Sequence, residues 1–299
     1  MSATVTSHKV WRPPSVERVA AALGAAAASI FDFRLGTHFS MVTRESGSQR
    51  DDLPIWAPSA NVVPFSDAWG PVRRSDVPGV PGAFVLSNVL TDAEADAVSA
   101  LSEAMGYTED APVSLGRHIR RNENCVIIAD STLWQPIWQR VRQHMPPTVE
   151  HPAGTCQAPV GLNQRWRLYK YGPQDVFKMH TDGSWPGSGL DADGRLVRDI
   201  YRDRWSQLTF LIYLDGEYDG GETTFFVPSH FDPRSGTLVS VAVPKGSVLC
   251  FFHGDHEHSL LHEGSLVTKG VKRIVRSDVL YTLPGRPAPT STDEVCAVE

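Results

Sequence analysis

The sequence predicts a mainly β protein with flanking helices, built around an antiparallel sandwich or barrel. Six short segments rich in aromatic and β-branched residues follow one another, and Gly, Pro or Asp residues separate them. They span residues 165–171, 206–216, 222–228, 237–246, 247–253 and 272–283. No segment with helical periodicity lies between these strands, and strands that follow one another without helices pair in antiparallel sheets.

Two helices are expected ahead of the strands. The first covers "TDAEADAVSALSEAMGY", where Thr91 can cap the helix and Glu94 completes a capping box. The second covers "TLWQPIWQRVRQHMP". The alanine-rich run at 16–31 faintly resembles a targeting segment, but Glu17 interrupts its basic region, and an ordinary helix begun by Ser15 is the better interpretation.

These patterns divide the chain into four parts. Residues 1–32 form an N-terminal alanine-rich helical segment, and residues 33–78 form a linker or strap with no sustained periodicity. Residues 79–285 form the main domain, and residues 286–299 form a disordered tail.

Composition excludes several classes of partner. With 299 residues, 41% of them hydrophobic, the chain can bury one core of ordinary size. A net charge of −6, with scattered Lys and Arg, argues against nucleic acid as a partner, and no apolar run is long enough for a membrane span. The four cysteines lie far apart and are interpreted as reduced thiols, which predicts a cytoplasmic protein.

A metal site is suggested by "FKMHTDGSW". On an extended strand His180 and Asp182 point to the same face, which makes them a ready N,O chelating pair. The only dense source of a third ligand is the later cluster "FFHGDHEHSLLHEG", which contains His253, His256, His258 and His262. Two His and one carboxylate leave coordination positions open, as in Fe(II) oxygen chemistry rather than closed zinc sites.

Among the four histidines, His262 has the most informative context. A turn signal at 268–270 separates two strand-like pieces, and a hairpin folded about residue 267 would set His262 opposite or near Lys272. A cation beside the metal would suit an anionic co-substrate. The other three histidines are interpreted as a solvated or hydrogen-bonding loop, with His256 as a candidate substrate contact.

Three segments in one order resemble the iron(II) and 2-oxoglutarate dependent oxygenases similar to prolyl 4-hydroxylases. They are "YGPQDVFKMHTDG", "LTFLIYLDGEYDGGETTFF" and "PKGSVLCFFHGDHEHSLLHEGSLVTKGVKRIVRSDVLY". The resemblance covers about residues 79–283 and implies a double-stranded β-helix, or jelly-roll, core.

The resemblance also implies roles for individual residues. It makes three residues the iron ligands, namely His180, Asp182 and His262. It makes Lys272 the partner of the distal carboxylate of 2-oxoglutarate and Tyr171 a hydrogen-bond donor to the same group. Arg276 is the alternative carboxylate partner.

The activity implied is hydroxylation of a C–H bond with release of succinate and CO2. Fe(II), 2-oxoglutarate and O2 would be required, with ascorbate as a possible reductant. The candidate substrates are a peptidyl proline, a free amino acid or a small metabolite, because related folds serve all three.

Residues 184–207 form a long polar insertion directly after the His-x-Asp pair. Such loops are commonly lids or recognition elements, so Trp185, Tyr201 and Arg202 are candidate substrate contacts. Asn163 and Arg167 are candidates for the pocket wall, with a structural salt bridge as the alternative role of the arginine.

Three other classes fit parts of the pattern. A cupin-like metal oxygenase that does not use 2-oxoglutarate would lack Lys272 in its pocket. A non-catalytic binding module would keep the fold, although the intact ligand set argues against it. A halogenase needs a vacant coordination position where Asp182 stands, so the carboxylate favours hydroxylation.

Overall fold

The computed structural model describes residues 4–16, 31–67, 69–111, 118–151 and 154–285. The alanine-rich helix expected at 16–31 and the tail at 286–299 therefore fall almost entirely outside the described residues. Within the described ranges, no helix is both long and apolar enough to cross a membrane.

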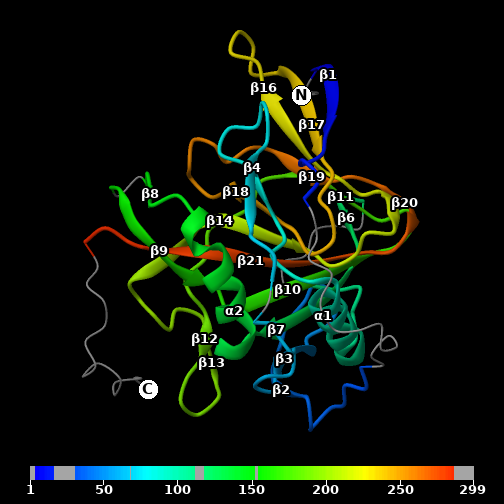
Figure 1. Cartoon of the computed structure of the whole chain (residues 1–299), viewed down its shortest axis with the longest axis vertical. Helices are drawn as coiled ribbons and strands as arrows, with labels where there is room; N and C mark the ends of the chain where they lie inside the picture. The colour runs from blue at the N-terminus through cyan, green and yellow to red at the C-terminus, as the bar shows by residue number, and fades with distance from the viewer. Residues whose placement is uncertain (1–3, 17–30, 68, 112–117, 152–153, 286–299) are drawn as a thin grey trace.

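Eight strands form a jelly roll of two facing sheets (Figure 1). The larger sheet contains β10 (Arg165–Tyr171), β21 (Lys272–Thr282), β14 (Arg204–Tyr213) and β18 (Val248–Phe252), paired in that order. The smaller sheet contains β17 (Ser235–Val241), β16 (Thr223–Pro228), β19 (His262–Gly264) and β11 (Val176–His180), paired in that order. Because the chain passes back and forth between the sheets, the core is the double-stranded β-helix that the sequence motifs implied.

The alternation of side chains along each strand gives the larger sheet two apolar faces. On β14, Leu211 and Tyr213 lie in a cluster with Phe225 and Val239 of the smaller sheet, which fills the space between the sheets. Leu208, Phe210 and Ile212 of the same strand face the other way, into the cluster that includes residues of the helices.

Two helices cover the outer face of the larger sheet. Helix α1 (Asp92–Met105) begins at Thr91, and the expected capping box with Glu94 is present. Helix α2 (Ser131–Val141) begins at Asp130 and is followed by a 3-10 turn at Arg142–His144. The carboxylate of Glu94 joins the two helices through a buried ion pair with Arg140 at 2.7 Å.

Additional strands extend the larger sheet at both edges. β5 (Phe84–Ser87) and β4 (Arg73–Asp76) follow β18, whereas β7 (Glu123–Ile128), β3 (Leu53–Pro58) and β2 (Phe39–Glu45) follow β10. β8 (Thr148–Val149) and β9 (Cys156–Leu162) pair beside β21. Three of these strands lie in residues 33–78, where no regular strand was expected. Prolines and polar residues in that segment obscure the alternation of apolar and polar side chains, and edge strands need this alternation only weakly.

The smaller sheet gains β6 (Arg120–Arg121) beside β11 and β1 (Thr4–Trp11) beside β17. β1 runs parallel to β17, some 230 residues later in the chain. Four short strands form two separate ladders: β12 (Gly189–Leu190) with β13 (Leu196–Val197), and β15 (Tyr218–Gly220) with β20 (Val267–Gly270).

The hairpin expected about residue 267 is not formed. His262 lies on β19 of the smaller sheet and Lys272 begins β21 of the larger sheet, so the two residues are not cross-strand neighbours. β19 already pairs with β11 and β16, and β21 pairs with β10 and β14. Neither strand has a free edge for the other, and the intervening chain pairs with β15 instead.

Candidate metal centre

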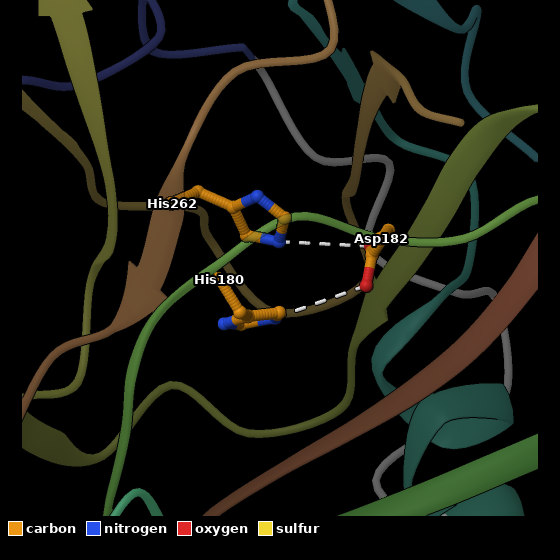
Figure 2. A group of neighbouring side chains, drawn as sticks. All are labelled: His180, Asp182 and His262. Atoms are coloured by element: carbon orange, nitrogen blue, oxygen red, sulfur yellow. Dashed lines mark ion pairs between the residues drawn. The ribbon is translucent and has the colours of Figure 1, made fainter. Parts of the chain in front are cut away.

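Three side chains converge between the two sheets. His180 ends β11 and is in register with His262 on β19, and Asp182 follows two residues after His180. One ligand atom from each of the three residues lies within 4.8 Å of the other two. Figure 2 shows the three side chains pointing toward one another. In the described part of the chain this is the one such group of His, Cys, Asp and Glu side chains.

Each imidazole is oriented by a backbone carbonyl. Nδ1 of His180 lies 2.7 Å from the carbonyl oxygen of Lys178, and Nδ1 of His262 lies 3.1 Å from that of Leu260. An N–H at Nδ1 would donate to these oxygens and leave each Nε2 free as a ligand. The two Nε2 atoms point toward Asp182, at 3.8 Å and 3.6 Å from its carboxylate (Figure 2).

The electrostatics of the group suit metal binding. Burial and the neighbouring His262 lower the pKa of His180 to about 4, so its imidazole is neutral near pH 7. Burial alone would raise the pKa of Asp182, but the Arg276 guanidinium and His262 hold it well below its usual range. A neutral His180 imidazole and a charged Asp182 carboxylate are the forms in which these two groups act as ligands.

Asp182 is held from behind by a chain of buried polar groups. Thr209 donates its hydroxyl proton to Oδ2 of Asp182 at 2.7 Å, and Thr209 Oγ1 lies 2.9 Å from Nδ1 of His253. Because the single Thr209 proton goes to the carboxylate, Nδ1 of His253 must be the donor in that contact. Nε2 of His253 then accepts from Ser206 Oγ at 2.9 Å.

The three non-ligand histidines differ from one another. His253 is 1% exposed, so the expected hydrogen-bonding role holds for it while the expected solvation does not. His256 stacks on Phe252 with ring centroids 3.8 Å apart, and its Nδ1 accepts from the backbone N–H of His258. Sequence reasoning missed the support given by Thr209 and Ser206, because neither belongs to a motif of charged or ligating residues.

Lys272 is a buried cation that forms no ion pair with the described residues, although Glu222 attracts it from a greater distance. It is 2% exposed, and its Nζ donates to the carbonyl oxygen of Gly221 at 2.5 Å. The Nζ lies 5.4 Å and 5.2 Å from the ring centroids of Tyr171 and Tyr213. No carboxylate of the described residues forms an ion pair with Lys272, and burial lowers its pKa to about 8.

Gly221 allows the lysine to reach this position. It has a φ of +68°, and an added Cβ would lie 2.9 Å from a Val267 methyl and 3.2 Å from the Lys272 side chain. The preceding Gly220 has φ +74° at the bulge of the β15–β20 ladder. Any larger residue at Gly221 would push against the side chain of Lys272.

Tyr171 lies on the same inner face and is in register with Lys272. Its hydroxyl makes no hydrogen bond to the rest of the described chain, whereas that of Tyr213 is bonded to Thr223 at 2.6 Å. Burial raises the pKa of Tyr171, so its hydroxyl keeps its proton and is available as a donor.

Arg276 is engaged by two carboxylates. Its Nη1 lies 3.0 Å from Oδ1 of Asp182, and its Nη2 lies 3.2 Å from Oδ1 of Asp278. Burial on its own would lower the pKa of Arg276, but the carboxylates of Asp182 and Asp278 and the neighbouring Tyr169 raise it. In this structure Arg276 therefore supports the metal ligand rather than presenting a free guanidinium.

The candidate substrate residues do not gather in one place. Trp185 is 36% exposed and lies over the guanidinium of Arg167, at 5.2 Å from ring centroid to Cζ. Tyr201 bonds Gln164 and carries Arg204 over its ring, and Arg202 is exposed with φ +58°. Asn163 anchors the insertion, donating to the carbonyl of Pro186 at 3.0 Å and accepting from Ser188 N–H at 3.1 Å.

The donor set fits an Fe(II) ion. Imidazole and carboxylate are ligands that suit this ion, and two His with one carboxylate on one side leave other positions open. Oδ2 of Asp182 accepts a hydrogen bond from Thr209 and Oδ1 forms an ion pair with Arg276, and both oxygens retain lone pairs for a metal. Phe177 stacks on His180 at 3.5 Å, and Phe225 and Phe251 flank His262, which makes the surroundings of the ligands apolar.

No family model matches the chain, and no curated protein matches it either. Several solved structures are similar to it at low identity. A viral collagen prolyl hydroxylase from Paramecium Bursaria Chlorella virus-1 is 16% identical, with 67% of this chain and 96% of that chain covered and a TM-score of 0.41.

A prolyl-4-hydroxylase of Pseudomonas putida is 15% identical, with 66% and 92% of the two chains covered and a TM-score of 0.41. HygX of Streptomyces hygroscopicus, solved with nickel and 2-oxoglutarate, is 15% identical, with 69% and 84% covered and a TM-score of 0.40. The similar structures thus include prolyl hydroxylases and structures solved with 2-oxoglutarate, the group that the sequence motifs resemble.

Proposed function

We propose that this chain is an Fe(II)- and 2-oxoglutarate-dependent dioxygenase that hydroxylates a C–H bond and releases succinate and CO2. The observation that carries the proposal is the combination of two features on facing sheets. One is the convergence of His180, Asp182 and His262 with their donor atoms within 4.8 Å. The other is the buried ammonium of Lys272, which forms no ion pair in the described chain.

Bound iron would supply the oxygen chemistry, with 2-oxoglutarate and O2 as co-substrates and ascorbate as reductant. The protein's residues hold and tune the site. Nε2 of His180, Nε2 of His262 and a carboxylate oxygen of Asp182 are the atoms that would bind the metal. The carbonyls behind the imidazoles and the Thr209 hydroxyl behind the carboxylate fix the directions of these ligands.

Lys272 and Tyr171 are the proposed partners of the distal carboxylate of 2-oxoglutarate. Lys272 now donates to one backbone acceptor, the carbonyl oxygen of Gly221. A bound carboxylate would instead form an ion pair with its ammonium, and such a charge-assisted contact is strong in a buried site. The free hydroxyl of Tyr171 can donate to the same group. This pair of groups favours a 2-oxoglutarate enzyme over a cupin-like oxygenase that has no such co-substrate.

The proposed catalytic unit is the domain of residues 79–285, which contains every residue named for the site. The candidate substrates are a peptidyl proline, a free amino acid or a small metabolite, with Trp185, Tyr201, Arg202 and His256 as proposed contacts. Cys125, Cys156 and Cys250 are buried free thiols, which supports a reducing and hence cytoplasmic setting.

The test is to measure succinate formed from 2-oxoglutarate by the iron-loaded protein in air, against a panel of peptides, amino acids and metabolites. We expect a low rate without a substrate and a higher rate with one panel member, both dependent on added Fe(II). Omitting iron or 2-oxoglutarate serves as the control. No iron-dependent succinate under any condition would contradict the proposal.

A further inference from the structure

Arg167 lies near the candidate metal centre, and its guanidinium forms no ion pair with the described residues. On the inner face of the larger sheet Arg167 is in register with Arg276, which reaches the metal-binding carboxylate of Asp182 at 3.0 Å. Directly opposite residues on one face have Cβ atoms roughly 5 Å apart, so Arg167 lies one strand away from the metal centre.

Two arginines next to Arg167 form ion pairs with carboxylates. Arg276 takes up both Asp182 and Asp278, and Arg165, on the same strand as Arg167, pairs with Glu45. Within the described ranges the side chain of Arg167 forms neither a hydrogen bond nor an ion pair, and its guanidinium lies against the Trp185 ring. An arginine stays charged in proteins, and the half-buried Arg167 side chain has no protein acceptor for its N–H donors among the described residues.

The region around Arg167 is electropositive. Burial on its own would raise the pKa of the adjacent Tyr169, yet Arg120, Arg167 and Arg276 bring it below its ordinary value. Burial likewise lowers the pKa of Arg167 itself. Arg276, directly opposite, is already paired with Asp182 and Asp278, whereas Arg167 forms no ion pair within the described ranges.

The position of Arg167 is that of a substrate contact. On its other side it is in register with Val126 of β7, whose cluster with Ile55 and Ile128 is covered by Leu190 and Leu196 of the insertion. Trp185, three residues after the metal-binding carboxylate, covers the guanidinium itself. Arg167 therefore lies between the metal centre and the insertion.

We propose that Arg167 binds a carboxylate of the substrate, so that the substrate is a free amino acid or another small organic acid rather than an internal proline of a peptide. The proposal rests on the proposed oxygenase function and narrows its substrate class. The planar fork of arginine matches a carboxylate with two parallel hydrogen bonds, and Trp185 holds the fork in place by stacking.

This site is separate from that of the co-substrate's distal carboxylate. Lys272 and Arg276 are four residues apart on β21, which is roughly 13 Å along a strand. Lys272 is in register with Tyr171, whereas Arg167 is in register with Arg276. The two cations can therefore bind two different anions at once.

The first experiment measures binding without turnover. Nickel(II) replaces iron, 2-oxoglutarate is added, and isothermal titration calorimetry compares free L-amino acids with the amides of the same amino acids. We expect at least one acid to bind about ten- to a hundredfold more tightly than its amide. Equal binding of acids and amides, or tighter binding of an uncharged internal-proline peptide or a phosphate monoester, would overturn the proposal, and this comparison needs no variant.

The second experiment compares Arg167→Met with Lys170→Met, a change on the same strand that affects a side chain paired with Glu103 next to the helices. In Arg167→Met the preference for acid over amide should vanish without a rise in the KM for 2-oxoglutarate, and Lys170→Met should keep both the preference and the wild-type rate of substrate-independent succinate formation. A rise of that KM instead would assign Arg167 to 2-oxoglutarate and overturn the proposal. Absence of succinate from the wild type would contradict the oxygenase function itself, which is a separate result.

Discussion

At the scale of single residues, the co-substrate assignment depends on Lys272. Its ammonium is buried, has one backbone acceptor, and stands between two tyrosine rings. Lys272→Ala should raise the apparent KM for 2-oxoglutarate about thirty- to a hundredfold, because a charge-assisted contact of about 2 to 3 kcal/mol is lost. Iron affinity should change far less, since the three proposed ligands remain.

Steady-state kinetics with varied 2-oxoglutarate, alongside an iron titration, provides the measurement. Lys269→Ala is the matched control, because Lys269 is exposed on the neighbouring β20. An unchanged KM in Lys272→Ala would transfer the role to another cation, and Arg276 would then have to release Asp182 or Asp278.

The same lysine predicts a pH dependence. Burial lowers its pKa to about 8 in the protein without co-substrate, and the proposed ion pair needs the protonated form. As the pH rises through about 8 the free protein loses this charge, so the apparent KM for 2-oxoglutarate should be flat at lower pH and should increase at higher pH by up to about tenfold per unit. Lys272→Arg keeps its charge over this range, so the same rise of KM in that variant would contradict the assignment.

At the scale of elements, the insertion at 184–207 is a small ordered unit. β12 and β13 pair within it, and Leu190 and Leu196 pack on the cluster of Ile55, Val126 and Ile128. Its base is fixed by the side chain of Asn163 and by the Trp185–Ser206 contact. The insertion therefore covers the inner face of the larger sheet next to the metal centre while supplying none of the three proposed ligands.

Replacing residues 186–200 by a Gly-Ser bridge should spare iron binding and substrate-independent succinate formation but severely reduce hydroxylated product. Lids commit the substrate and exclude water without binding the metal, which is the physical reason for this separation. Succinate and hydroxylated product are measured side by side. Shortening the β16–β17 turn at 230–233 is the control, and tight coupling at wild-type rates in the 186–200 variant would show that the insertion is only a surface loop.

The turn between β2 and β3 is held by the carboxylate of Asp110. Asp110 accepts hydrogen bonds from the backbone N–H groups of Ser48, Gln49 and Arg50 in the turn between β2 and β3. Burial on its own would raise the pKa of Asp110, but these hydrogen bonds lower it to about 2. The carboxylate should therefore stabilise the fold at pH values above its ordinary pKa of 3.8, and this stabilisation should be lost as the pH falls toward 2.

Asp110→Asn should lower the free energy of unfolding near pH 7 by about 1 to 2 kcal/mol, because the charge of the acceptor is removed while its shape is kept. Denaturant unfolding at neutral pH and at about pH 2.5 provides the measurement, and the difference between variant and wild type should shrink at the lower pH. Asp193→Asn, at an exposed position of the insertion, is the control. A difference that stays constant with pH would show that the charge of Asp110 is not what holds the turn.

At the scale of the whole molecule, the sequence predicted six of the eight jelly-roll strands and both helices but not their partners. All six strand-like segments coincide with β10, β14, β16, β17, β18 and β21, because aromatic and β-branched residues mark buried strands strongly. β1 was not expected, since nearly all of it is exposed and its parallel partner β17 is more than two hundred residues away. Pairing at such separation depends on the assembled sheet rather than on any local pattern.

The site divides in the same way. His180 and Asp182 were predictable from two-residue spacing on a strand, and His262 and Lys272 came from the motif resemblance. Thr209 contacts both Asp182 and His253, and Arg276 contacts Asp182. These contacts depend on which strands are neighbours, which the sequence did not show. The predicted His262–Lys272 hairpin was wrong for the same reason, because local turn signals do not reveal which strand edges are already occupied.

The central claim is that His262, and not a neighbouring histidine, completes an iron centre that consumes 2-oxoglutarate. The most direct test is the initial rate of succinate formation as a function of added Fe(II) for the wild type, His262→Ala and His256→Ala, with circular dichroism to verify that each is folded. We predict that His256→Ala keeps iron-dependent succinate formation and that His262→Ala loses it while remaining folded. Iron-dependent succinate formation that survives in His262→Ala but is lost in His256→Ala would contradict this account.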